Sequence, residues 1–325
     1  MIRMAHGSGG KETEELVKAV FLQHFRNDTL GRLEDAAVLE LTGKTAFTTD
    51  SFVVTPLFFK GGDIGRLAVC GTVNDLLMMG AQPRYLSAGF IIEEGLALET
   101  LDAVAASMAR TAAEAGVSIV AGDTKVIEGH GGLYINTAGI GTIPDGRDLG
   151  AIRCAPGDAV LVSGDLGDHH ACILSARMKI ENGIESDAAP LCAPVQALLA
   201  SGADVKAMRD VTRGGLTTII NELCAASGTG AALEEAALPV SAQTAAFCEI
   251  LGLDPLYMGN EGKFAAVVNG KDALTALDAL RSTPEGHHAA IIGRIVETKG
   301  VVLETKLGGR RRLGVLAGEG LPRIC

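Results

Sequence analysis

The chain has 325 residues, of which 47% are hydrophobic, and a formal net charge of −11. This length is sufficient for the cores of two domains of ordinary size. The negative charge argues against binding nucleic acid or an anionic membrane by bulk electrostatics. An acidic protein can still bind nucleotide phosphates when its carboxylates hold them through Mg²⁺.

The ends and the cysteines of the chain indicate where the protein works. The first residues, MIRMAHGSGGKETEEL, lack the apolar run of a secretory signal, and no later segment has the length of a membrane-spanning helix. The seven cysteines form no CxxC pair, and most lie inside apolar runs, where they read as small buried residues. We therefore expect a reduced, cytoplasmic protein in which Cys325, the last residue, is the exception.

The first half of the chain alternates helix-like and strand-like segments. Hydrophobic spacing predicts helices at 12–25, 63–80 and 98–116, and the last two are ended by glycines. The strand-like runs are 36–41, 45–50, 85–92, 118–122 and 133–143. The stretch 144–158, rich in Pro, Gly and Asp, is typical of a domain boundary.

The second half has the same mixed character. Helices are expected at 190–201, 213–227 and 241–251, and strands at 159–164, 263–268, 289–296 and 301–306. The fold class is therefore α/β (α+β), with one domain over 1–150 and another over 151–307. We predict that the Gly-rich remainder, 308–325, is a flexible tail that ends in Cys325.

A glycine-rich stretch, HGSGGKE (6–12), directly precedes the first predicted helix. Bare backbone amides at a helix N-terminus form a cradle for anions, and Lys11 adds a positive charge. The alternative is a flexible helix start with no ligand, because a lone Gly-rich loop is weak support for a phosphate site.

Aspartates recur beside the apolar runs of both halves. They are Asp35, Asp50, Asp75, Asp123 and Asp210. Any one of them is ordinarily a helix cap or a turn residue. Aspartate is disfavoured inside helices and strands, so the whole set predicts a converging acidic pocket suited to Mg²⁺ that bridges phosphates.

Two cations and one further carboxylate complete the candidate chemistry. Lys125 in GDTKV would contact phosphate or transfer a proton, and Arg213 in RDVTRGGL would clamp phosphate. A solvated lysine and a surface ion pair are the plainer interpretations. Glu261 in NEGKF is only suggestive, and six histidines that follow no ligand spacing are interpreted as non-catalytic.

These motifs together resemble a known family. HGSGGKE, EDAAVL, TTDSFVVTPLFFKGGDIG, GTVNDLLMMGA, AGDTKV, RDVTRGGL and the terminal PRIC are similar, in register over the whole chain, to the HypE hydrogenase maturation proteins, which are carbamoyl dehydratases. The aspartate and glycine motifs are shared with the superfamily of aminoimidazole ribonucleotide synthetase, selenophosphate synthetase and thiamine-monophosphate kinase. The terminal PRIC, which ends in a cysteine, is the part of the resemblance that is specific to the HypE proteins.

The resemblance implies a homodimer that pairs its N-terminal domains and binds ATP near that interface. By motif it assigns Mg²⁺ ligands to Asp35, Asp75, Asp123 and Asp210. Nucleotide contacts fall to Gly7, Ser8, Gly9, Gly10, Lys11, Asp50, Asn74 and Thr124, and Arg213 joins them through its own chemistry.

The resemblance also implies a reaction and its partners. Cys325 would receive a carbamoyl group from the carbamoyltransferase HypF, and ATP would drive dehydration of the resulting thiocarboxamide to a thiocyanate. The cyano group would then pass to iron on the HypC–HypD scaffold complex. Lys125 with Glu34 is the candidate relay for the protons that leave the carbamoyl nitrogen.

Other functions stay open at this point. Selenophosphate synthetases carry a cysteine or selenocysteine in the Gly-rich loop, and here that loop has no thiol. The synthetase and kinase alternatives give no reason for a terminal cysteine. A non-catalytic thiol carrier or scaffold would present Cys325 to partners, but it would need neither an acidic pocket nor a Gly-rich loop.

Overall fold

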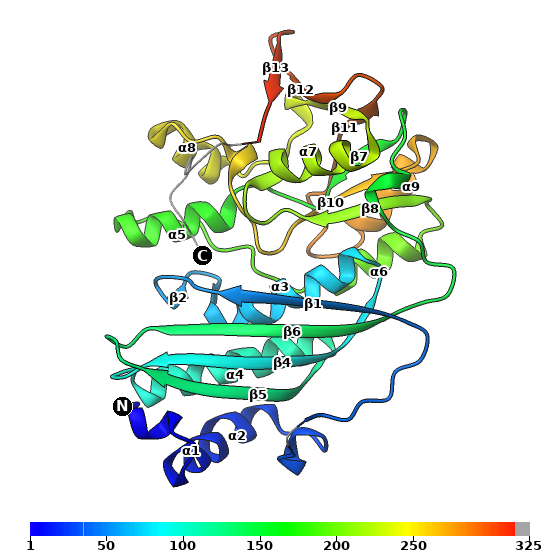
Figure 1. Cartoon of the computed structure of the whole chain (residues 1–325). Coiled ribbons are helices and arrows are strands. Elements are labelled where there is room, and N and C mark those ends of the chain that lie inside the picture. Colours follow the sequence, from blue (N-terminus) through cyan, green and yellow to red (C-terminus); the bar gives the residue numbers. More distant parts are fainter. Residues whose placement is uncertain (35, 316–325) are drawn as a thin grey trace.

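The computed structural model describes residues 1–34 and 36–315. It has two α/β domains, each built on its own sheet. The N-terminal domain is at the bottom of Figure 1 and the C-terminal domain is at the top. Within these ranges no helix is long and apolar enough to cross a lipid bilayer.

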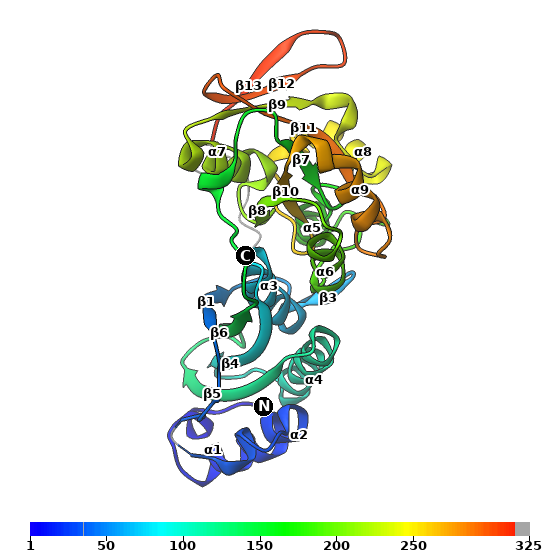
Figure 2. The ribbon, with the colours of Figure 1, turned by 90° about the vertical axis from the view of Figure 1, so that its right-hand side faces the viewer.

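The N-terminal domain is built on a four-stranded sheet. Its order is β1 (Lys44–Phe52), β6 (Leu133–Ile143), β4 (Gln82–Glu93) and β5 (Ser118–Ile127). The β4–β5 pair is parallel and the other two pairs are antiparallel. Helices α3 (Ile64–Met78) and α4 (Leu98–Ala115) cover one face, as Figure 2 shows, and the two-residue strands β2 (Phe58–Phe59) and β3 (Gly62–Asp63) lead into α3.

Helix α3 is buried on nearly every side because it lies between the sheet, α4 and the C-terminal domain. It begins at Asp63, whose carboxylate accepts hydrogen bonds from the backbone amides of Gly65 and Arg66 at 2.7 and 3.1 Å. Ser107 of α4 donates to the same carboxylate at 2.6 Å. This cap therefore fixes the position of α3 relative to α4.

The opposite face of the N-terminal sheet is left open by the described residues. Exposed and half-buried residues alternate along β1, with Phe47 68% exposed, and Ile91 and Ile127 are also exposed. Apolar side chains on an open sheet face are typical of an interaction surface.

The N-terminal segment packs against α4 and β5 and is continuously helical over residues 11–25. It consists of η1 (Met4–Gly7), α1 (Lys11–Leu16), a π-helical turn (Val17–Phe21), α2 (Leu22–Phe25) and η3 (Leu30–Arg32).

The C-terminal domain has a seven-stranded sheet with helices packed around it. The strand order is β13 (Arg310–Leu313), β12 (Gly300–Glu304), β9 (Gly230–Glu234), β11 (Ala290–Val296), β7 (Ala159–Val162), β10 (Phe264–Val268) and β8 (Val205–Asp210). The helices are α5 (Asp168–Met178), α6 (Cys192–Ala200), α7 (Gly215–Ser227), α8 (Ala242–Leu251) and α9 (Ala273–Arg281).

The predicted elements agree with the structure except at three kinds of place. Residues 36–41 form no strand, and Val38 is 82% exposed. Two helices and two strands of the C-terminal domain were not predicted, namely α5, α9, β8 and β9. The predicted flexible tail starts too early, because β13 pairs with β12 and buries Leu313 to 1% exposure.

Candidate functional site

A group of carboxylates lies where the two domains meet. Asp50 comes from β1, Asp75 from the last turn of α3 and Asp210 from the end of β8. Asp75 and Asp210 line a cavity of about 370 Å³ whose walls come from both domains. The Thr48 hydroxyl donates a hydrogen bond to Asp75 at 2.8 Å.

The negative charges of this group are poorly compensated. Burial raises the pKa of Asp75, and nearby Asp50 raises it further. Burial, followed by the charge of Asp75, raises the pKa of Asp210 to about 7. Such a cluster favours a bound cation. Among the described residues, however, no group of three or more His, Cys, Asp or Glu side chains is arranged to hold a metal ion, so any ion needs ligands from elsewhere.

Arg213 faces the carboxylates from the turn that opens α7. Its Nη2 lies 4.0 Å from Asp50 Oδ1, and its side chain is largely exposed. Gly214 and Gly215 follow with φ of +82° and +64°. A Cβ on Gly215 would lie 2.5 Å from the Leu256 carbonyl oxygen, so the tight turn requires glycine there.

Glu261 is the residue that the sequence indicated only weakly. It precedes β10, and its backbone N–H donates to Asp187 Oδ1 at 3.0 Å. Burial, together with Asp187, Asp210 and Asp50, raises its pKa well above the ordinary value, and Arg213 opposes the shift. Burial of this kind favours the protonated form of the carboxyl and makes its ionised form a stronger base than an exposed carboxylate.

The glycine-rich loop packs against β5, which is the edge strand of the N-terminal sheet opposite β1. A Cβ on Gly7 would lie 2.5 Å from the Val126 amide nitrogen, so the loop approaches β5 through bare backbone. The Gly9 amide donates to Thr13 Oγ1 at 3.0 Å, and the Ser8 hydroxyl donates to the Ala5 carbonyl at 2.8 Å.

The remaining residues of this loop also lie on the surface. Gly10 is the N-cap of α1, and Lys11 Nζ is 3.7 Å from Glu15 in an exposed ion pair.

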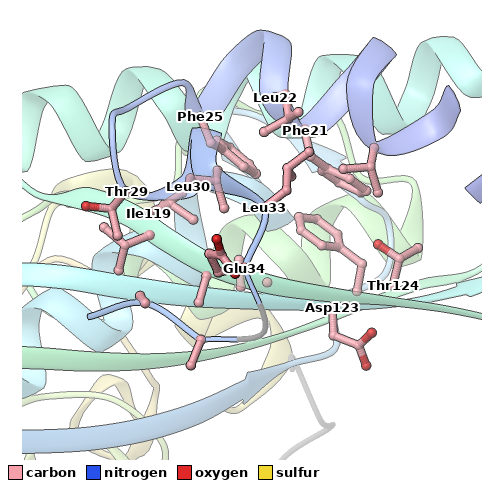
Figure 3. A pocket seen from close by; sticks show the side chains of 18 of the residues that line it. Phe21, Leu22, Phe25, Thr29, Leu30, Leu33, Glu34, Ile119, Asp123 and Thr124 are labelled. Carbon is pink, nitrogen blue, oxygen red and sulfur yellow. The ribbon is translucent and has the colours of Figure 1, made fainter. Parts of the chain in front are cut away.

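A second cavity, of about 270 Å³, lies between the N-terminal helix and β5. Figure 3 shows that Phe21 and Phe25 come from the helix, Glu34 from the segment after it, and Asp123 and Thr124 from β5. One cavity wall is therefore aromatic, and the opposite edge is polar.

Lys125 is paired with Asp123 on the same strand. Its Nζ lies 2.7 and 2.6 Å from the two carboxylate oxygens, and the ammonium lowers the pKa of Asp123. Our predicted relay placed Glu34 beside Lys125. The structure pairs the lysine with Asp123, because residues i and i+2 of a strand share a face. Glu34 lines the adjacent cavity with Asp123, and its part in the relay stays a prediction.

The prediction of one converging pocket is wrong for a single chain. Strands β1 and β5 are the opposite edges of the four-stranded sheet. Three strand spacings of about 4.8 Å separate them by about 14 Å. Asp50, Asp75 and Asp210 therefore form one group at the domain interface, and Asp123, Thr124, Lys125 and Glu34 form another beside β5.

Asn74, predicted to lie close to the nucleotide, has its side chain bonded to the C-terminal domain. Its side-chain amide donates to the Ala189 carbonyl at 3.0 Å, and its side-chain carbonyl accepts from the Leu191 amide at 2.8 Å. Only 2% of the residue is exposed. Asn74 thus links α3 to the C-terminal domain and does not face the carboxylates with a free polar group.

Two predicted site residues, Asp35 and Cys325, lie outside the described residues. The six described cysteines are free thiols, five of them buried. Burial raises the pKa of each, to about 12 for Cys154 and about 11 for Cys192 and Cys248. None of these six is therefore activated as a thiolate nucleophile.

The comparisons with known proteins agree with this architecture. Two family models match, the AIR synthase related protein N-terminal domain over residues 33–143 and the corresponding C-terminal domain over residues 155–306. Carbamoyl dehydratase HypE of Rhodobacter capsulatus is 47% identical and is covered over 98% of its length by this whole chain.

Two solved structures are also similar over nearly the whole chain. The crystal structure of hydrogenase maturation protein HypE in complex with ATP is 46% identical with a TM-score of 0.96, and each chain is fully covered. A HypE–HypF complex contains a chain that is 43% identical, with a TM-score of 0.82, over 94% of this chain and all of that one. The present chain therefore belongs to the carbamoyl dehydratase HypE family of AIR synthase related proteins.

Proposed function

We propose that this chain is an ATP-dependent carbamoyl dehydratase that converts a carbamoyl group on Cys325 to a cyano group for the iron centre of a NiFe hydrogenase. The observation that carries the proposal is the full-length similarity to HypE together with a cysteine as the last residue. The raised pKa values of the six described cysteines support the choice of Cys325 as the reactive thiol.

The interface carboxylates suit Mg²⁺ bound together with ATP phosphates. Asp75 and Asp210 offer hard oxygen ligands whose raised pKa values report uncompensated charge. Since the described residues form no complete metal site, phosphate oxygens and Asp35 would supply further ligands. Bound Mg²⁺ would offset the charge of the transferring phosphoryl group, and Arg213 would contribute to the same end.

A homodimer would bring the two separated groups of residues together. The open face of the N-terminal sheet carries exposed Phe47 and Ile91, which a second copy would cover. In such a pair the Lys125–Asp123 edge of one copy would approach the carboxylates of the partner copy. ATP bound there would contact the Gly-rich loop from one side and Arg213 from the other.

The chemistry follows from the poor leaving ability of the carbamoyl oxygen. Attack of this oxygen on the γ-phosphorus of ATP releases ADP and forms an O-phosphorylated thiocarbamate. Loss of phosphate then breaks the C–O bond, while the two nitrogen protons leave and the C≡N bond forms on sulfur. The net change is loss of one water from the carbamoyl group, with ATP converted to ADP and phosphate.

One group is suited to take these protons, and another is suited to position the reacting atoms. Glu261 is a buried carboxyl with a raised pKa beside the interface carboxylates. Lys125 is ion-paired to Asp123, so it is suited to orient a carbonyl or phosphate oxygen. We therefore assign the base to Glu261 and a positioning role to Lys125.

The partners follow from the family. The carbamoyl donor is HypF, and the acceptor of the cyano group is iron on the HypC–HypD complex. Cytoplasmic maturation enzymes of this kind would work on a reduced thiol at Cys325.

Mass spectrometry of the C-terminal peptide tests the proposal. After incubation with HypF, carbamoyl phosphate and ATP, the peptide should gain a carbamoyl group and then lose the mass of one water. A Cys325→Ala chain should show neither change, while it still binds ATP. Persistence of the carbamoyl adduct in the wild-type chain despite ATP turnover would reject the dehydratase function.

A further inference from the structure

A short segment of the C-terminal domain is bonded both to helix α3 and to the loop that carries Glu261. It comprises residues 185–191, and we call it the interdomain strap. Arg66 Nε of α3 donates a hydrogen bond to the Ala188 carbonyl at 2.6 Å. Asn74, near the other end of α3, bonds to the strap at residues 189 and 191. The N-terminal domain therefore fixes the strap from both ends of one buried helix.

Asp187 joins the strap to the loop that carries Glu261. Asp187 Oδ1 accepts a hydrogen bond from the Glu261 amide at 3.0 Å, and the Ala189 amide donates to the Glu261 carbonyl at 3.4 Å. The two backbones also pack closely, because a Cβ on Gly262 would lie 1.8 Å from the Asp187 carbonyl oxygen. The backbone of Glu261 is therefore held by the strap.

The strap thereby relates Glu261 to the interface carboxylates. Asn74, which binds the strap, directly precedes Asp75 in α3. A continuous series of contacts therefore runs from Asp75 through Asn74 and the strap to Asp187 and Glu261. Through these contacts the position of Glu261 depends on both domains, although the residue itself belongs to only one of them.

Asp187 is an expensive residue to bury at this place. Its side chain is 5% exposed, and Lys263 Nζ lies 3.4 Å from its Oδ2. Among the described residues this Oδ2 has no hydrogen-bond partner. A buried ion pair of this kind seldom stabilises a fold more than an apolar pair of similar volume would. The property that Asp187 adds is therefore the acceptor at Oδ1, which holds Glu261.

We propose that Asp187 is a positioning residue that holds Glu261 in register with Asp75 for proton transfer from the carbamoyl nitrogen. The inference rests on the proposed function, because it takes Glu261 as the base of that reaction. A base must lie within hydrogen-bond reach of the proton that it accepts, and a displacement of about 1 Å costs up to about 100-fold in rate. Loss of the Asp187 acceptor should therefore slow dehydration and leave ATP binding unchanged.

A matched set of double variants separates the acceptor from the charge. All of them carry Lys263→Met, so that no buried ammonium is left without its partner. Asp187→Asn keeps an oxygen for the Glu261 amide, whereas Asp187→Leu, of similar shape, and the smaller Asp187→Ala provide none. Each full chain is carbamoylated on Cys325, and its single-turnover conversion is measured at saturating ATP.

The Leu and Ala chains should convert the carbamoyl group about tenfold to 100-fold more slowly than the Asn chain. The Kd for ATP should be the same in all three chains, because the strap holds the base and not the nucleotide. Asp272→Leu is the matched control. It removes an acceptor for the Asp204 amide, which lies 3.0 Å away before the start of β8, at the opposite end of this strand from Asp210. Its rate should equal that of wild type.

The same set in a Glu261→Gln chain shows whether Asp187 acts through Glu261. The difference between the Asn chain and the Leu and Ala chains should disappear, because no base is left to position. Equal rates for the Asn, Leu and Ala chains with Glu261 present would overturn the inference. An undiminished difference in the Glu261→Gln chain would also overturn it, because Asp187 would then support the structure in general. If the wild-type chain kept its carbamoyl group while ATP was consumed, the proposed function would fail first.

Discussion

Replacement of Asp210 by asparagine should stabilise the ligand-free protein at pH 8. Asp210 carries its charge in both the folded and the unfolded chain at this pH, but in the folded chain that charge faces Asp75 and is partly removed from water. Asparagine keeps the shape of the side chain without the charge. The predicted change is therefore a gain in the free energy of unfolding, at the expense of a ligand for Mg²⁺.

The magnitude follows from the pKa of Asp210, which is raised from 3.8 to about 7. A shift of about three pH units corresponds to an upper limit of about 4 kcal/mol. Because Asp210 keeps some exposure to solvent, we expect a gain of about 1–3 kcal/mol. A raised carboxyl pKa contributes stability that is present below pH 4 and is lost as the pH rises through 7. The gain in the free energy of unfolding caused by Asp210→Asn should therefore be less than half as large at pH 5 as at pH 8.

Urea unfolding of wild type and Asp210→Asn at pH 5 and pH 8, without nucleotide or Mg²⁺, measures this difference. Asp278→Asn, at an exposed position of α9, is the matched control, and its effect on the free energy of unfolding should be small. An equal gain for Asp210→Asn at both pH values, or a loss at pH 8, would refute the electrostatic account of the cluster.

Three further predictions concern the loop, the dimer and the base. Gly7→Ala should raise KM for ATP, since its Cβ would lie 2.5 Å from the Val126 nitrogen, whereas Gly31→Ala, which meets nothing within 4 Å, should leave steady-state kinetics unchanged. Chains with Asp210→Asn and chains with Lys125→Ala should each be inactive alone but recover activity when mixed under subunit exchange; absence of recovery would argue against a site shared between two copies. Glu261→Gln should lower the single-turnover rate by at least about 100-fold, within the usual range for general acid–base catalysis, with KM for ATP unchanged; a normal rate would exclude Glu261 as the base.

Local patterns were sufficient for most of the N-terminal domain. The spacing in 63–80 predicted α3, and the alternation in 85–92 and 133–143 predicted β4 and β6, because burial on one face leaves a clear period in the sequence. The apolar run at 36–41 predicted a strand that does not form, because a short run carries no information about whether a partner strand is available.

The composition of the site depended on tertiary structure that no local pattern contains. Asp50, Asp75 and Asp210 could be predicted as a group from their places beside apolar runs. The separation of Asp123 from them follows from strand order, which is set by long-range pairing. The structural contacts of Asn74 could not be predicted, because its partners, the backbone of residues 189 and 191, are far away in the chain.

The burial of Glu261 beside the interface carboxylates could not be predicted, because a single glutamate before a strand has no distinctive spacing. Only its burial, and the carboxylates that surround it, indicate a role. The side chains of Asn221 and Tyr257 donate hydrogen bonds to the backbone at the end of β13, and these too could not be predicted in a tail rich in glycine and arginine.

The fate of the carbamoyl oxygen tests the central claim most directly. Cys325 would be loaded with a carbamoyl group labelled with oxygen-18, and a single turnover would be run with unlabelled ATP in unlabelled water. If ATP phosphorylates the carbamoyl oxygen, the label must appear in inorganic phosphate. Label found in water, or retained on the C-terminal peptide after ATP is consumed, would contradict the account.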